Sequence, residues 1–253
     1  MSLFMEAVGN GPDIVLLHGW GLHGGIWEET AAHLAKTFRV TCIDLPGHGR
    51  SAVIPEPYTL QTLAERILTV APRQAIWLGW SLGGMLAMHC AAIHPERVTK
   101  LILVASTPKF TRSTDWSHGI GTEVLEQFAQ ELEHDAKTTI RRFLALQLRD
   151  SERAQASVAA LNHAVFRHGL PATAALRGGL NILRNADLCT HLALITSPAL
   201  VIAGERDPLI PLPAGDYLAA NLPNGKLFTL AKAGHAPFVS HPAEFLRALN
   251  DFL

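Results

Sequence analysis

The chain has 253 residues, 48% of them hydrophobic and 17% charged, with a formal net charge of -1. This length allows one large domain with an inserted subdomain, and the near-neutral balance excludes a general attraction to nucleic acid or anionic membranes. No apolar run approaches the roughly 20 residues that cross a bilayer, and residues 1–6 do not resemble a signal peptide. We therefore expect a cytoplasmic protein, and a monomer.

Short apolar runs alternate with helical stretches along most of the chain. Runs rich in Val, Ile and Leu, each too short for a helix, predict strands near residues 14–17, 40–43, 75–78, 101–105, 199–203 and 227–230. Helical patterns fall near residues 26–36, 60–70, 82–93 and 243–252. This alternation predicts an α/β fold, a mostly parallel sheet with helices on both faces.

The alternation is interrupted between about residues 108 and 186, where helical patterns occur without any strand candidate. Two amphipathic faces are visible there, formed by Val124, Leu125, Phe128 and Leu132, and by Ile140, Phe143, Leu144, Gln147 and Leu148. We expect residues 1–107 and 187–253 to form the core domain, and residues 108–186 to form a helical cap inserted into it.

A G-x-S-x-G motif, Gly79-Trp80-Ser81-Leu82-Gly83, stands between a strand run and a helical pattern. This context is typical of a nucleophile elbow, a turn so tight that the serine is strained and its neighbours must be small. Gly79, Gly83 and Gly84 meet that requirement. The alternative interpretation is a glycine-rich turn with an idle serine.

Two further polar residues follow predicted strands. Asp207 comes after the run that ends at residue 203, and His235 comes after the last run. The loops after parallel strands meet at one edge of a sheet. Serine becomes a good nucleophile when a histidine takes its proton and a carboxylate orients that histidine. The chain order therefore predicts a triad of Ser81, Asp207 and His235, with Glu205 as the rival acid.

Acyl transfer also needs donors for the oxyanion that forms on the substrate. The backbone N–H of Leu82 directly follows the nucleophile, and Trp20 lies in the loop after the first strand of the catalytic domain. We predict these two N–H groups as the donors; a turn with a packed indole is the alternative for Trp20. Neither H-E-x-x-H nor C-x-x-C occurs, so we predict no metal and no cofactor.

Seven stretches of the chain resemble the sequence motifs of a known protein family. They are Leu16–Leu22, Asp44–Ser51, Ile76–Gly84, His94–Val98, Arg142–Gln147, Ala231–Phe238 and Ser240–Phe245. Over nearly its whole length the chain is similar to the α/β-hydrolases, and within them it resembles the pimeloyl-[acyl-carrier protein] methyl ester esterases of the biotin pathway. The elbow motif is typical of the whole superfamily. Its Trp-Ser pair, the Phe-Leu-Ala-Leu-Gln run and the final stretches are specific to a much smaller group of proteins.

The resemblance implies a serine carboxylesterase. Its substrate would be the methyl ester at the far end of a pimeloyl chain carried on acyl carrier protein, and its products the free acid and methanol. By position the resemblance implies the same triad and places Trp20, Leu82 and His235 at the substrate. It also implies an acyl channel lined by Phe143, Leu144, Ala145, Leu146 and Gln147.

Basic residues in the cap indicate where an acidic carrier protein would dock. They are Lys137, Arg141, Arg142, Arg149 and Arg153, and they outnumber Asp150 and Glu152 in the same stretch. Among the arginines that the resemblance leads us to expect, only Arg142 is present, because Thr138, Gln155 and Ala159 stand at the other positions. The alternative interpretation is an ordinary solvated helix face.

Other functions remain open. A general short-chain carboxylesterase, or a carbon–carbon hydrolase, would use the same triad on free small substrates. A binding protein built on an inactive hydrolase would normally lack a triad residue. Relatives with an aspartate nucleophile, such as dehalogenases, are disfavoured because residue 81 is serine.

Overall fold

The computed structural model describes residues 3–55, 57–147 and 166–253. Its centre is a seven-stranded sheet of order β1-β3-β2-β4-β5-β6-β7. The strands are β1 (Met5–Val8), β2 (Asp13–Leu17), β3 (Arg39–Ile43), β4 (Ala75–Trp80), β5 (Val98–Val104), β6 (Ala199–Gly204) and β7 (Gly225–Leu230). β1 pairs antiparallel with β3, and all the other neighbours run parallel. The predicted α/β fold is confirmed.

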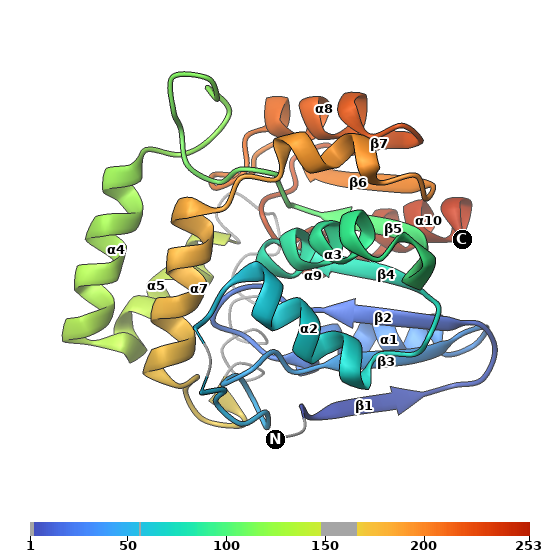
Figure 1. Ribbon diagram of the computed structural model, residues 1–253, viewed down its shortest axis with the longest axis horizontal. Coiled ribbons are helices and arrows are strands. Elements are labelled where there is room, and N and C mark those ends of the chain that lie inside the picture. The colour runs from blue at the N-terminus through green and yellow to red at the C-terminus, as the bar shows by residue number, and fades with distance from the viewer. Residues whose placement is uncertain (1–2, 56, 148–165) are drawn as a thin grey trace.

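β1 is the strand that the sequence did not predict. All four of its residues are exposed, and it lies at the edge of the sheet (Figure 1). By contrast, all six residues of β4 are buried. An apolar run reveals a strand only where the strand is buried, so an exposed edge strand gives no such signal.

Helices cover both faces of the sheet. In Figure 1, α2 (Leu60–Val70) and α3 (Leu82–Ile93) lie in front of the strands, and α1 (Glu28–Leu34) and α10 (Pro242–Phe252) lie behind them. The predicted helices at 60–70 and 82–93 match α2 and α3 residue for residue. The structure adds α8 (Leu212–Asn221) and the short α9 (Pro237–Ser240), which were not predicted.

Three helices lie together beyond the carboxyl ends of the parallel strands (Figure 1). They are α4 (Thr122–His134), α5 (Ala136–Gln147) and α7 (Thr173–Asn185). None of the seven strands comes from the described residues between 108 and 186. The buried leucines and isoleucines of these helices join the same apolar core as the sheet. The division into core and cap therefore stays our proposal. No helix in the described ranges is long and apolar enough to cross a bilayer.

The burial of α4 and α5 follows the two predicted faces, with one correction. Ile140 and Leu144 are fully buried, and Leu125 and Leu132 are nearly so. Val124 was predicted to share the buried face, but it is 49% exposed. Successive residues of a helix point about 100° apart, so Val124 points away from the direction of the buried Leu125. Leu148 lies outside the described residues.

α7 is attached to the core at three points. The Nε1 of Trp20 donates to the carbonyl oxygen of Leu176 at 2.9 Å, and the N–H of Ala172 donates to the carbonyl oxygen of Gly47 at 2.8 Å. A Cβ on Gly179 would lie 2.5 Å from Cδ1 of Trp20, so the helix reaches the indole only because this residue has no side chain. These contacts fix α7 to the loops that follow β2 and β3.

The substitution Gly179→Ala tests this close approach. Alanine favours a helix interior by about 1 kcal/mol over glycine, yet the added methyl group would press on the Trp20 ring. We expect a net loss of about 1–3 kcal/mol in the free energy of unfolding. Thr173→Ala, at an exposed position in the same helix, should change it by less than about 0.5 kcal/mol. A higher melting temperature for Gly179→Ala would contradict the packing.

Candidate active site

Ser81 lies in the turn between β4 and α3, with φ 54° and ψ -118°. A positive φ is rare for a residue with a side chain, and strain of this kind concentrates at functional sites. The serine N–H donates to the carbonyl oxygen of Val104 at 3.0 Å. Its carbonyl oxygen accepts a hydrogen bond from Oγ of Ser106 at 2.9 Å. Both peptide groups of the strained residue are thus held by β5 and the loop after it.

The glycines around Ser81 allow the strand, the turn and the helix to touch. A Cβ on Gly83 would lie 2.5 Å from the carbonyl oxygen of His18, and one on Gly79 would overlap the carbonyl of Gly83. A Cβ on Gly84 would lie 2.5 Å from the side chain of Ser106. The structure therefore places the predicted elbow glycines where no larger residue fits.

Asp207 and His235 form a buried pair at the ends of β6 and β7. Nδ1 of His235 lies 2.8 Å from Oδ2 of Asp207, and each side chain is 1% exposed. The other carboxylate oxygen accepts hydrogen bonds from the N–H groups of Leu209 and Ile210 at 2.8 and 3.0 Å. Because a carboxylate only accepts, the neutral ring carries its proton on Nδ1. Nε2 is then an acceptor, and it is buried with no partner among the described residues.

Glu205, the rival acid, points to a different part of the loop. Its side chain accepts a hydrogen bond from the N–H of Lys232 at 2.9 Å, and the residue is exposed. The geometry therefore joins Asp207, and not Glu205, to the imidazole of His235.

Trp80 connects the elbow with the His235 loop, a contact that the sequence did not reveal. Its Nε1 donates to the carbonyl oxygen of His235 at 2.8 Å. The indole also packs edge-on against Phe238 at 5.0 Å between ring centroids. The only signal in the sequence was the position of Trp80 directly before Ser81.

The two predicted oxyanion donors lie beside Ser81. A Cβ on Gly19 would be 3.4 Å from Cβ of Ser81, so the peptide between Gly19 and Trp20 borders the serine. Leu82 is the first residue of α3, and the first N–H groups of a helix have no acceptor within it. Both Trp20 and Leu82 are 1% exposed. This arrangement offers N–H donors to an anionic oxygen next to Ser81.

Three aromatic rings, one from this loop and one each from α4 and α5, pack together. The centroids of Trp20, Phe128 and Phe143 are 5.3 Å apart in each pair, and Leu144 is fully buried beside them in α5. Phe128 had been assigned only to a buried helix face. Ala145 is exposed on α5, next to the buried Leu144, and its place in the channel lining stays a prediction.

The last two predicted channel residues end α5. Leu146 and Gln147 belong to this helix, but their side chains lie outside what the structure describes.

The predicted docking residues are placed only in part. Lys137, Arg141 and Arg142 are exposed on α5, whereas Arg149 and Arg153 lie outside the described residues. Nη1 of Arg142 lies 3.6 Å from a carboxylate oxygen of Glu131, and the guanidinium of Arg141 lies 5.2 Å from the ring centroid of Phe166. Lys137 and Arg141 are therefore the positions at which an acidic partner would meet a cation without breaking an ion pair between α4 and α5.

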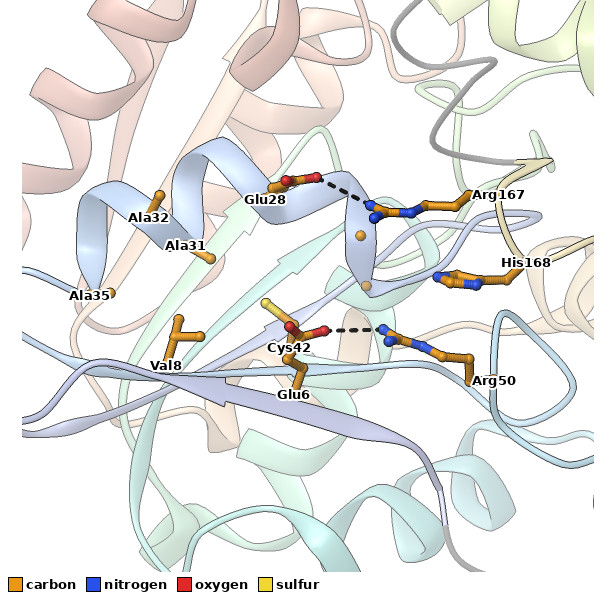
Figure 2. Close-up of a pocket in the computed structure, with 12 residues that line it drawn as sticks. Glu6, Val8, Glu28, Ala31, Ala32, Ala35, Cys42, Arg50, Arg167 and His168 are labelled. Atoms are coloured by element: carbon orange, nitrogen blue, oxygen red, sulfur yellow. Dashed lines mark hydrogen bonds and ion pairs between the residues drawn. The ribbon is translucent and has the colours of Figure 1, made fainter.

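A hollow of about 520 Å³ lies between β1 and α1, and its lining includes neither Ser81 nor His235. Figure 2 shows Glu28 facing Arg167 and Glu6 facing Arg50 across it, at 3.7 and 3.2 Å. The carboxylates on its wall thus balance its guanidinium groups. In the described part of the chain, no three His, Cys, Asp or Glu side chains come together in a way that could hold a metal ion.

Comparison with known proteins agrees with this fold. The sequence profile of the alpha/beta hydrolase fold matches residues 12–242. An esterase from Exiguobacterium antarcticum superposes with a TM-score of 0.89 at 21% identity, covering 99% of this chain and 94% of that one. At this identity the superposition supports the fold alone.

Curated relatives are much closer in sequence. The pimeloyl-[acyl-carrier protein] methyl ester esterase of Chromobacterium violaceum is 42% identical over 253 residues, covering 100% of this chain and 98% of that protein. The protein of the same name from Yersinia enterocolitica is 44% identical over 252 residues, covering 99% and 97%. The profile match and these relatives show that the chain is an α/β-hydrolase with carboxylic ester hydrolase chemistry. Within this class the chain belongs to the family of the pimeloyl-[acyl-carrier protein] methyl ester esterases.

Replacing Trp80 by phenylalanine tests the contact between the elbow and the His235 loop. The change removes one buried N–H donor and leaves the carbonyl of His235 unpaired. We expect kcat for a p-nitrophenyl ester to fall by about three- to tenfold. Trp77→Phe is the matched control, because the Nε1 of Trp77, in the same strand, is buried without a hydrogen-bond partner among the described residues. Equal losses in both variants would show that the Trp80 contact does not position His235.

Proposed function

We propose that this chain is a serine carboxylesterase of biotin biosynthesis that hydrolyses the methyl ester of pimeloyl-[acyl-carrier protein]. The products are pimeloyl-[acyl-carrier protein] and methanol. The observation that carries the proposal is the identity of 42–44% with esterases of that name, which extends over the whole chain. The buried Asp207–His235 pair and the strained Ser81 supply a suitable site for the chemistry.

In the proposed mechanism, Oγ of Ser81 attacks the ester carbonyl while Nε2 of His235 takes its proton. The N–H groups of Leu82 and Trp20 donate to the oxyanion of the tetrahedral intermediate. The intermediate breaks its bond to the methoxy oxygen, which leaves as methanol with the proton from His235. A water molecule, deprotonated by His235, then attacks the acyl-enzyme and frees Ser81. Throughout, Asp207 holds the imidazole through Nδ1 and stabilises its protonated form.

The cap would hold the acyl chain and its carrier. Phe143 and Leu144 offer apolar surface next to Trp20, which suits the methylene groups of a pimeloyl chain. Lys137 and Arg141 offer exposed cations to an acidic carrier protein. Arg142 would also bind the carrier protein, through the part of its guanidinium group that does not face Glu131. The cytoplasmic location and the monomeric state stay predictions.

Substitutions in the triad test the chemistry. Ser81→Ala should lower kcat for a p-nitrophenyl ester by about 10⁴-fold or more, with an unchanged melting curve. Asp207→Asn should lower it by about 10⁴-fold, because the ring would take the wrong tautomer. Glu205→Gln is the matched control and should stay near wild type, since the Glu205 side chain accepts its hydrogen bond from the N–H of Lys232, whereas His235 pairs with Asp207. An inactive Glu205→Gln with an active Asp207→Asn would reverse the assignment of the acid.

A double charge reversal tests carrier recognition. Lys137→Glu with Arg141→Glu should raise KM for the carrier-bound methyl ester by about fivefold, since exposed ion pairs contribute about 0.2–1 kcal/mol each. Turnover of the free monomethyl ester should not change. Lys36→Glu with Lys226→Glu makes the same charge change at two exposed positions, one three residues before β3 and one at the start of β7. This control should leave both substrates unaffected.

The outcomes of this reversal separate the candidate functions. Equal losses on both substrates would assign a structural role to the α5 cations. A wild-type preference for the free ester, with no effect of either reversal, would favour a general short-chain esterase.

A further inference from the structure

His18 is a fully buried histidine next to the predicted oxyanion loop. The N–H of Leu45 donates to its Nε2 at 2.9 Å, and its Nδ1 lies 2.8 Å from the carbonyl oxygen of Gly19. A backbone N–H only donates, so Nε2 must be unprotonated. The ring proton therefore sits on Nδ1 and is donated to Gly19. One tautomer satisfies both contacts, and the ring joins the end of β3 to the loop after β2.

The contact with Gly19 fixes the direction of the next N–H group. The described peptide bonds are all trans, and in a trans peptide the C=O and the following N–H point in opposite directions. A carbonyl of Gly19 held by His18 therefore turns the N–H of Trp20 away from His18. The same peptide borders Ser81, because a Cβ on Gly19 would be 3.4 Å from Cβ of the serine.

The far side of His18 is equally well fixed. Leu45 follows Asp44, whose carboxylate accepts hydrogen bonds from the N–H groups of Gly24 and Arg50 at 2.7 and 2.8 Å. The carbonyl oxygen of Asp44 also accepts from Oγ of Ser51 at 2.6 Å. The donor at Leu45 thus belongs to a rigid turn, and the imidazole transmits its position to the oxyanion loop.

The surroundings of His18 keep the ring neutral. Burial is the main cause that lowers the pKa of His18 to about 3, and the neighbouring His48, 5.3 Å away between ring centroids, acts in the same direction, against the opposing charge of Asp44. Near neutral pH, Nε2 therefore stays available as the acceptor for Leu45.

We propose that His18 is a positioning residue for ester hydrolysis, which aims the N–H of Trp20 at the oxyanion by holding the carbonyl of Gly19. This inference rests on the proposed serine esterase function. The hydrogen bond from His18 to Gly19 would help to stabilise the transition state, so loss of this bond should lower kcat and leave KM unchanged.

Two substitutions separate the two hydrogen bonds of the ring. In His18→Asn the side-chain amide can donate to Gly19 from about the position of Nδ1, but cannot reach Leu45. In His18→Gln the longer side chain can accept from Leu45 at about the position of Nε2, but loses Gly19. We expect kcat on a p-nitrophenyl ester to fall by about 10²-fold in His18→Gln, as for loss of one oxyanion donor, with KM nearly unchanged. His18→Asn should restore most of kcat.

Two further readouts distinguish positioning from simple stability. The affinity for a boronic acid inhibitor, which forms a tetrahedral adduct on the serine, should fall in parallel with kcat. His48→Gln is the matched control, because His48 is also buried and its Nδ1 contacts the carbonyl of Pro46 at 3.0 Å. It should lower the melting temperature without lowering kcat.

The proposal is overturned if His18→Asn and His18→Gln lose kcat equally, or if boronate affinity does not follow kcat. If His18→Gln does not fold, the unmutated protein can still be tested by nitrogen NMR of its imidazoles. The spectrum should show His18 with its proton on Nδ1. A proton on Nε2 instead would exclude the hydrogen bond from His18 to the carbonyl of Gly19 and overturn the proposal. Failure of the proposed function itself would look different, because the unmutated protein would then not hydrolyse the ester, or Ser81→Ala would keep the activity.

Discussion

The close approach of β4 and α3 at Ser81 is the constraint on which the rest of the site depends. The serine takes a positive φ, and the turn persists because β5 and the loop after it hold both of its peptide groups. Gly83 brings the same turn against the carbonyl of His18, at the start of the oxyanion loop. Trp80 extends it to the carbonyl of His235. The strained turn at Ser81 is thus in contact with the loop after β2 and, through Trp80, with the His235 loop.

Trp20 connects the loop after β2 with the helices α4, α5 and α7. Its indole donates to α7 and packs against Phe128 in α4 and Phe143 in α5. Its backbone N–H belongs to the peptide that His18 orients. A shift of α4, α5 or α7 would therefore also move the loop after β2, which borders Ser81.

The sequence predicted the buried parts of the fold and the residues with distinctive chemistry. The six parallel strands are apolar runs, and Ser81, Asp207 and His235 each follow one of them. β1 was missed because it is exposed, and Val124 was misplaced because helical periodicity does not define the edges of a buried face. The contacts of Trp80 and Trp20 join residues 155 and 156 positions apart. No local pattern encodes such partners, since they depend on the assembled sheet.

The most direct test of this account is labelling with a fluorophosphonate ester, followed by intact-mass and peptide mass spectrometry. The account predicts one phosphonyl group per chain, attached to Ser81, and loss of labelling in step with loss of esterase activity. His235→Ala should slow the labelling strongly, because Nε2 of this residue activates the serine. An adduct on another residue, or full esterase activity in a chain that carries the label on Ser81, would contradict the account.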